Sequence, residues 1–230
     1  MRIRLAYAKE VDAKFIGHLD LARVFERAMR RAELPIAFSE GFNPHPKISF
    51  GSALALGTTS MCEYVDIELA QPMPVQGFIA LLQPQLPKGI TLLEGKEISR
   101  QAKPLMAVLN WLTYEIKVPL LLPVSQEKTD DVIGRFLAED TLLYARYSKK
   151  GRQEKNLRPF IGSLTGKVNG DWLELTMELR ITAQGTAKPV ELVAMLRAFG
   201  ELPLDVEATR VHRTGIYIKD GMEIKSPLEI

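Results

Sequence analysis

The alternation of hydrophobic and polar positions divides the chain into two halves of similar pattern. Residues 2–8 alternate apolar positions with arginines, which predicts a strand with one buried face. A helical pattern follows from about His18 to Glu33. The other elements expected in this half are strands at 35–38, 47–54 and 63–69, a helix at 74–86, and a strand at 90–98. This order is a decorated form of the split βαβ arrangement.

The second half repeats the outline without an obvious sequence repeat. Its expected elements are strands at 111–118, 141–147 and 172–182, helices at 126–138 and 189–199, and one or two strands within 204–218. The sequence therefore predicts an α+β fold. Two tandem ferredoxin-like (split βαβ) modules with mainly antiparallel sheets are expected, at residues 1–99 and 110–230, with a linker at 100–109.

Composition narrows the class of protein. The 230 residues are 46% hydrophobic and 25% charged, as in ordinary globular proteins, and the net charge is only +2. Any site for a polyanion must therefore come from local clustering of positive charge. The sequence has no signal-peptide pattern and no apolar run of membrane-spanning length.

The chemistry-bearing residues are few. Cys62 is the single cysteine, which excludes an intrachain disulfide and an iron–sulfur cluster ligated by this chain alone, and fits a cytoplasmic setting. The three histidines are scattered, so we expect no metal site and no cofactor of the chain's own. His18 and His45 are candidates for a general acid or base, but neither has a partner placed beside it by the sequence, and no catalytic residue is predicted.

Cationic residues cluster on the first predicted helix. Arg23, Arg27 and Arg30 are spaced i, i+4 and i+7 and therefore share one helix face, while apolar residues point elsewhere. Arginine binds phosphates well because its planar guanidinium presents several donors. We expect this face to contact a polyanion.

The loop after this helix has an unusual composition. Residues 39–47 contain Gly41 and two prolines, which predicts a rigid loop. Phe42 can stack on a nucleobase there, and His45 or Lys47 can reach a phosphate. The alternative is a well-packed turn in which Phe42 is buried.

A second basic segment lies in the other half. Its alternative interpretations are a nucleic-acid contact and a solvated basic loop. The candidate binding residues there are Lys149, Lys150, Arg152, Lys155 and Arg158. Lys188 and the backbone of residues 185–189 precede a predicted helix and can hold a phosphate, or the loop can simply cap the helix.

One long segment of the chain reads KFIGHLDLARVFERAMRRAELPIAFSEGFNPHPKISFGSALALGTTSMCEYVDIEL, and two shorter ones read LRPFIGSL and GTAKPVELV. The long segment resembles an uncharacterised bacterial family of radical-SAM-linked proteins, and the two short segments resemble it more weakly. Members of that family stand alone or are joined to the C-terminus of radical SAM proteins. The arrangement of helix and loop is also similar in pattern to CRISPR repeat-processing RNA-binding proteins. The resemblance implies a radical SAM protein as partner.

Three functions follow as hypotheses. The first is an RNA-binding accessory protein that presents tRNA or rRNA to a radical SAM modification enzyme. The second is a metal-independent endoribonuclease that uses His18 or His45. The third is a docking partner of the radical SAM protein that binds no nucleic acid. Because one cysteine cannot supply the CxxxCxxC motif of a radical SAM enzyme, this chain is not itself that enzyme.

Overall fold

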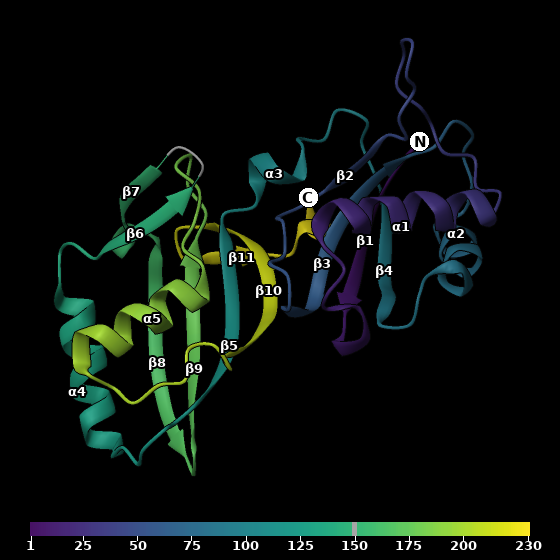
Figure 1. The fold of residues 1–230 in the computed structure, drawn as a ribbon. Coiled ribbons are helices and arrows are strands. Elements are labelled where there is room, and N and C mark those ends of the chain that lie inside the picture. Colours follow the sequence, from purple (N-terminus) through teal and green to yellow (C-terminus); the bar gives the residue numbers. More distant parts are fainter. Residues whose placement is uncertain (149–150) are drawn as a thin grey trace. The chain divides into compact units, whose positions relative to one another are not determined.

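The chain forms two compact units, described here from a computed structural model that covers residues 1–148 and 151–230. Unit 1 comprises Met1–Leu109 and Gly215–Ile230, and unit 2 comprises Asn110–Thr214. Both are mixed α+β structures with mostly antiparallel sheets (Figure 1). No helix among the described residues is long and apolar enough to cross a membrane.

Unit 1 contains a sheet in the order β4-β1-β3, with β2 also paired to β3. All three of these pairings are antiparallel. Its elements are β1 (Arg2–Lys9), α1 (His18–Arg31), β2 (Ile48–Phe50), β3 (Thr59–Glu68), α2 (Val75–Leu82), β4 (Ile90–Ile98), the short α3 (Leu105–Val108) and β11 (Glu223–Lys225), with 3-10 turns at Val11–Ala13, Gln83–Gln85 and Pro227–Glu229.

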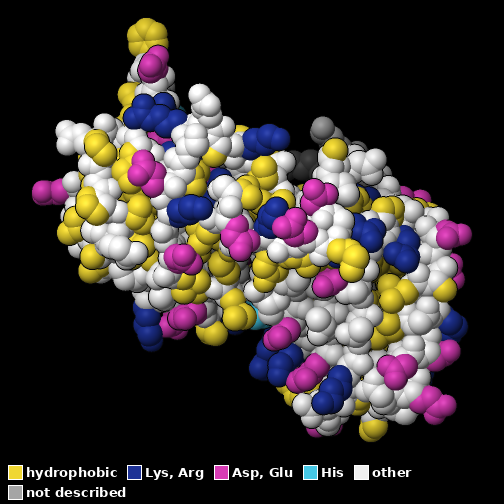
Figure 2. All heavy atoms as spheres, turned by 180° about the vertical axis from the view of Figure 1, so that it is seen from behind, with side chains coloured by type: hydrophobic (Ala, Val, Ile, Leu, Met, Phe, Trp, Pro, Cys, Tyr) yellow, Lys and Arg dark blue, Asp and Glu magenta, His cyan; other side chains and the backbone are white. Residues whose placement is uncertain are grey.

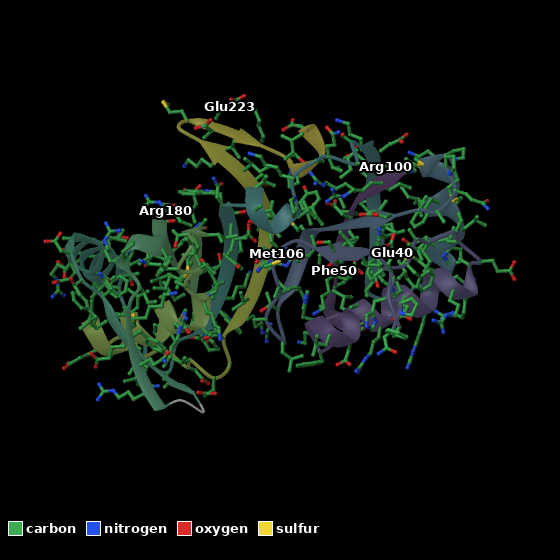
Figure 3. The ribbon with its side chains drawn as sticks, turned by 90° about the horizontal axis from the view of Figure 1, so that it is seen from above. Glu40, Phe50, Arg100, Met106, Arg180 and Glu223 are labelled. Carbon is green, nitrogen blue, oxygen red and sulfur yellow. The ribbon has the colours of Figure 1, made fainter. Side chains whose placement is uncertain are left out.

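The core of unit 1 lies between the sheet and α1. Phe25 of α1 is fully buried, and its ring packs edge-on against Tyr7 at 5.2 Å and Phe50 at 5.4 Å between centroids. Figure 3 shows Phe50 on the side of the strands that faces α1. Such edge-to-face contacts add to the burial of apolar area that holds the helix on the sheet.

Unit 2 has its sheet in the order β10-β5-β9-β8, and β5–β9 and β8–β9 are antiparallel. A separate hairpin, β6-β7, is inserted between α4 and β8. The elements are β5 (Trp111–Pro119), α4 (Gln126–Ala138), β6 (Leu143–Ser148), β7 (Gly151–Asn156), a 3-10 turn at Arg158–Phe160, β8 (Ile161–Asn169), β9 (Trp172–Arg180), α5 (Pro189–Gly200) and β10 (Arg210–Asp220), whose residues from Gly215 onward are part of unit 1.

Two boundaries differ from those expected. Residues 100–109 belong to unit 1, because Leu105 and Leu109 are buried there and α3 forms, and so they are not a free linker. Residues 215–230 also belong to unit 1, since Arg4 donates a hydrogen bond to the carbonyl oxygen of Pro227 and Lys96 donates one to that of Leu228. Sequence patterns are local and do not reveal such distant returns of the chain.

The expectation that β1 has one buried face is wrong. All eight of its residues are buried, and Arg2 and Arg4 occupy the second face. The short strands expected at 35–38 and 47–54 are also smaller than predicted. Only single bridges form at Ile36 and Phe38, and β2 is confined to Ile48–Phe50.

Candidate nucleic-acid interface

Helix α1 presents the three predicted arginines to solvent. Gly17 precedes the helix, and the buried stripe consists of Leu21, Phe25, Ala28 and Met29. Arg23, Arg27 and Arg30 lie off this stripe and are exposed. The amphipathic pattern therefore fixes the direction of the cationic face, as the sequence predicted.

The charges on this face are only partly compensated. Arg23 Nη1 lies 3.3 Å from Asp20 Oδ1, and Arg30 Nη2 lies 3.0 Å from Glu26 Oε1; of these four side chains only that of Glu26 is half-buried, and the other three are exposed. Within the described residues Arg27 has no ion pair. Exposed pairs of this kind contribute little, so phosphates can compete for these arginines. With four arginines against two acids, α1 carries a net charge of +2.

Residues 37–47 form a narrow hairpin that projects beyond the ends of the strands, while α1 crosses in front of them (Figure 1). Its stem is paired by backbone bonds from Lys47 N to Ala37 O and from Ser39 N to His45 O, and His45 N donates to Ser39 Oγ. Gly41 has a φ of +116°, which glycine adopts without strain. The loop is therefore a built hairpin.

The tip of this hairpin is Phe42, whose relative exposure is 107%. The alternative of a packed turn with Phe42 buried is therefore wrong. Figure 2 shows an apolar side chain at the end of the projection, with charged side chains below it. On the face drawn there, lysine, arginine and acidic side chains are otherwise interspersed.

The remaining candidates of this region differ in their surroundings. Lys47 is exposed and its Nζ lies 3.4 Å from Glu68 Oε2. His45 is exposed, and His18 is exposed with its ring edge-on to Phe50 at 5.6 Å between centroids. In the part of the chain that the structure describes, neither imidazole has a side-chain hydrogen-bond partner.

The basic segment of unit 2 is largely engaged in structure. Lys149 and Lys150 lie outside the described residues. Lys155 donates to the carbonyl oxygen of Gln184 at 2.8 Å and lies over the ring of Phe160 at 4.2 Å. Partial burial, together with the positive charge of Arg146, lowers the pKa of Lys155.

The two arginines of this segment have partners within unit 2. Arg152 Nη2 lies 2.6 Å from Glu154 Oε1, between exposed side chains. Arg158 donates to the carbonyl oxygen of Leu137 at 3.1 Å, which ties the turn before β8 to the end of α4. Of these two, Arg152 is the more accessible to a ligand.

The N-terminus of α5 already holds a carboxylate. Lys188 N donates to Glu191 Oε2 at 3.0 Å, and Arg146 binds both oxygens of Glu191 at 2.6 and 2.8 Å. Glu191 is buried, so this pair occupies the position where a phosphate would bind. Residues 185–189 therefore include the cap of α5, and phosphate binding by Lys188 stays a prediction. The Lys188 side chain is exposed.

Sequence reasoning missed two features of unit 1. Arg2, Arg4 and Asp66 form a buried ionic network, although a strand with alternating arginines predicts an exposed face. Phe15 and Leu19, on either side of His18, are 70% and 75% exposed. Leu19 falls outside the buried stripe of α1, which is the one signal in the sequence that could have identified its exposure.

Other chemistry is limited among the described residues. No group of three or more histidines, cysteines, aspartates and glutamates there is arranged to hold a metal ion. Burial raises the pKa of the Cys62 thiol, which disfavours the thiolate that a nucleophile needs.

The fold and this surface define a two-unit α+β protein with an exposed cationic helix and an aromatic-tipped hairpin. A family model described as "Uncharacterized protein conserved in bacteria (DUF2344)" matches residues 2–189. The chain belongs to this family. No curated protein sequence matches it significantly.

Two solved structures match this chain at low sequence identity. One is a chain in the crystal structure of a Cbf5-Nop10-Gar1 complex, with a TM-score of 0.53, 12% identity, and coverage of 95% of this chain and 50% of that chain. The other is a chain in an archaeal box H/ACA sRNP Nop10-Cbf5 complex, with a TM-score of 0.45, 10% identity, and coverage of 93% and 47%. This chain therefore spans about half the length of the chains it matches.

Proposed function

We propose that this protein is a non-catalytic RNA-binding accessory protein that presents tRNA or rRNA to a radical SAM modification enzyme in the cytoplasm. The observation that carries the proposal is the exposed face of Arg23, Arg27 and Arg30 on a helix whose opposite face is packed into the core. Phosphate contacts of this kind supply most of the sequence-independent affinity for nucleic acid.

The fold supports the proposal through the order of its strands. Both units have the order of a split βαβ module, in which the fourth strand lies beside the first and the third lies between the first and the second. We propose that both are ferredoxin-like modules, with the β6-β7 hairpin inserted into the second. Four-stranded sheets of this class are common in RNA-binding proteins, although fold alone does not imply function.

A protein partner is proposed on chemical grounds and on the resemblance. Radical SAM chemistry needs cysteines that this chain does not have, so a second protein would supply the reaction. The structurally similar chain of the Cbf5-Nop10-Gar1 complex likewise assembles with other proteins. The further exposed candidates for RNA contact are Phe42, His45, Lys47, Arg152 and Lys188.

RNA binding is tested by fluorescence anisotropy with a structured RNA hairpin over a range of salt concentrations. The test variant replaces Arg23, Arg27 and Arg30 by Gln, and the matched control replaces the exposed Lys117, Lys167 and Arg180 of unit 2 by Gln. The slope of log affinity against log salt should decrease by about two in the test variant, at roughly 0.7 per lost contact on single strands. The control should keep the slope of the unchanged protein.

Four results would contradict parts of the proposal. An unchanged slope in a folded test variant would remove α1 from the interface, and absence of any RNA binding would remove the function. Specific RNA cleavage that disappears in His18→Ala or His45→Ala would favour a nuclease. Failure of the co-expressed radical SAM protein to copurify with this chain would remove the proposed partner.

A further inference from the structure

The most exposed residue of the hairpin of residues 37–47 is aromatic. Phe42 is more exposed than any other large hydrophobic residue in the described part of the chain. An exposed phenylalanine forgoes the favourable transfer from water that burial provides. Single exposed apolar residues are common, so exposure alone does not identify a site.

The stem of the hairpin holds Phe42 in its exposed position. Backbone bonds between Lys47 and Ala37 and between Ser39 and His45 fix both strands of the stem, and the hydroxyl of Ser39 accepts a third bond from His45 N. Pro44 and Pro46 further restrict the returning strand. A ring held on such a support loses little conformational entropy when it binds.

The neighbours of the ring are polar. Glu40, Asn43 and His45 are exposed beside Phe42, so the tip is one apolar ring with hydrogen-bonding groups around it. A stable protein–protein contact needs a far larger continuous surface than one ring. A nucleobase matches this tip, because it offers a flat face of similar size and polar edges within reach of amide and imidazole groups.

We propose that Phe42 stacks on an unpaired base, so that the ligand of this surface is RNA with single-stranded nucleotides in a loop, bulge or end. This inference rests on the proposed RNA binding and makes it more specific. A base inside a continuous duplex has no free face, so duplex RNA would engage the arginines of α1 without the hairpin.

The experiment compares a single-stranded oligoribonucleotide containing 2-aminopurine with the same sequence in a duplex. Phe42→Ala should weaken binding of the single strand roughly 5- to 150-fold and leave the duplex unchanged. Phe42→Trp should retain the affinity and the quenching of 2-aminopurine, whereas Phe42→Leu, which is apolar but not aromatic, should lose both. Phe15→Ala, at another exposed phenylalanine of unit 1, is the matched control and should behave as the unchanged protein.

Stacking and phosphate contact separate by their salt dependence. Phe42→Ala should lower affinity at every salt concentration without changing the slope, because no cation is lost. Equal weakening of single strand and duplex, or full affinity in Phe42→Ala, would overturn the stacking proposal while leaving RNA binding intact. Unchanged RNA binding with loss of copurification with the radical SAM protein would instead assign the hairpin to protein docking.

Discussion

The two units share an order of elements. They differ in the exposure of the sheet face that lies opposite the helices. In unit 1 the face opposite α1 is closed, and every residue of β1 is buried. In unit 2 the corresponding face is polar and exposed over much of its area, although Trp111 is buried on it. The exposed residues there are Glu115 and Lys117 of β5, Thr165 and Lys167 of β8, and Thr176 and Arg180 of β9.

The closed face of unit 1 is held by charge. Arg4 and Asp66 lie opposite each other on β1 and β3, with 2.7 Å between Nε and Oδ1, and their side chains are 0% and 2% exposed. Arg2 Nη2 lies 2.7 Å from the second oxygen of Asp66. The C-terminal segment completes the network, because Arg4 also donates to the carbonyl oxygen of Pro227 at 2.8 Å.

The comparison shows that positively charged residues have two different roles within this chain. Arg2 and Arg4 are structural because neighbouring strands and the C-terminal segment surround them. Arg146 and Lys155 of unit 2 are structural because Glu191 and a backbone carbonyl bind them. Arg23, Arg27 and Arg30 of α1 are exposed, have weak partners or none among the described residues, and share one helix face, and this combination identifies the candidate interface.

Replacement of Asp66 by Asn should produce the largest effect of the variants that test this comparison. The change leaves the buried guanidinium of Arg4 without its counter-charge, and breaking a buried pair in this way costs about 3–5 kcal/mol. Unfolding in urea should therefore begin in unit 1. Hydrogen exchange should report it as faster exchange in β1 and β3 than in β5 and β9, because two units need not unfold together.

A double variant sharpens this test. Arg4→Met combined with Asp66→Leu removes both charges and should recover part of the loss, since apolar residues of similar volume often replace a buried pair without cost. Two results would contradict the view that this network closes unit 1. One is an equal loss of stability in both units, and the other is a decrease in the free energy of unfolding of less than about 1 kcal/mol in Asp66→Asn.

The sequence predicted much of the fold because most elements have clear periodicity. The bounds of α1 and α4 were close, and the exposed positions of Arg23, Arg27 and Arg30 follow directly from the buried stripe of the helix. The sheet face of β1 was misjudged, because burial of Arg2 and Arg4 depends on residues more than 60 positions away.

Prediction of the site was limited for a similar reason. A list of cations cannot distinguish Arg158, whose donors meet a backbone carbonyl, from Arg27, which faces solvent. The turn residues of the loop predicted its rigidity. They did not predict whether Phe42 would turn inward or outward, because that depends on the direction in which the stem leaves the unit.

Replacement of Ser226 by Ala should have an intermediate effect. We expect it to be confined to the C-terminal segment of residues 223–230, which covers the second sheet face of unit 1 and is called the cover below. Ser226 Oγ accepts a hydrogen bond from Leu228 N and lies 3.3 Å from the hydroxyl of Tyr64. Loss of a capping side chain costs about 1 kcal/mol. Hydrogen exchange should rise at residues 223–230 and leave unit 2 unchanged, and unchanged exchange at those residues would show that Ser226 does not secure the cover.

The smallest effect is expected on the open face of unit 2. The ammonium of Lys117 lies 2.9 Å from Glu174 Oε1, and its hydrogen bond lowers the pKa of that carboxylate. A carboxyl group with a lowered pKa in the folded state stabilises the protein above its ordinary pKa, and this contribution is lost as pH falls through the lowered value. Glu174→Gln should therefore lower the thermal midpoint slightly at pH 7 and have no effect well below pH about 4. Glu115→Gln, at an exposed carboxylate of β5 beside Thr176, is the control and should leave the midpoint unchanged at both values. A loss in Glu174→Gln as large as that in Asp66→Asn would mean that the open face is also held by charge, and the contrast between the two units would fail.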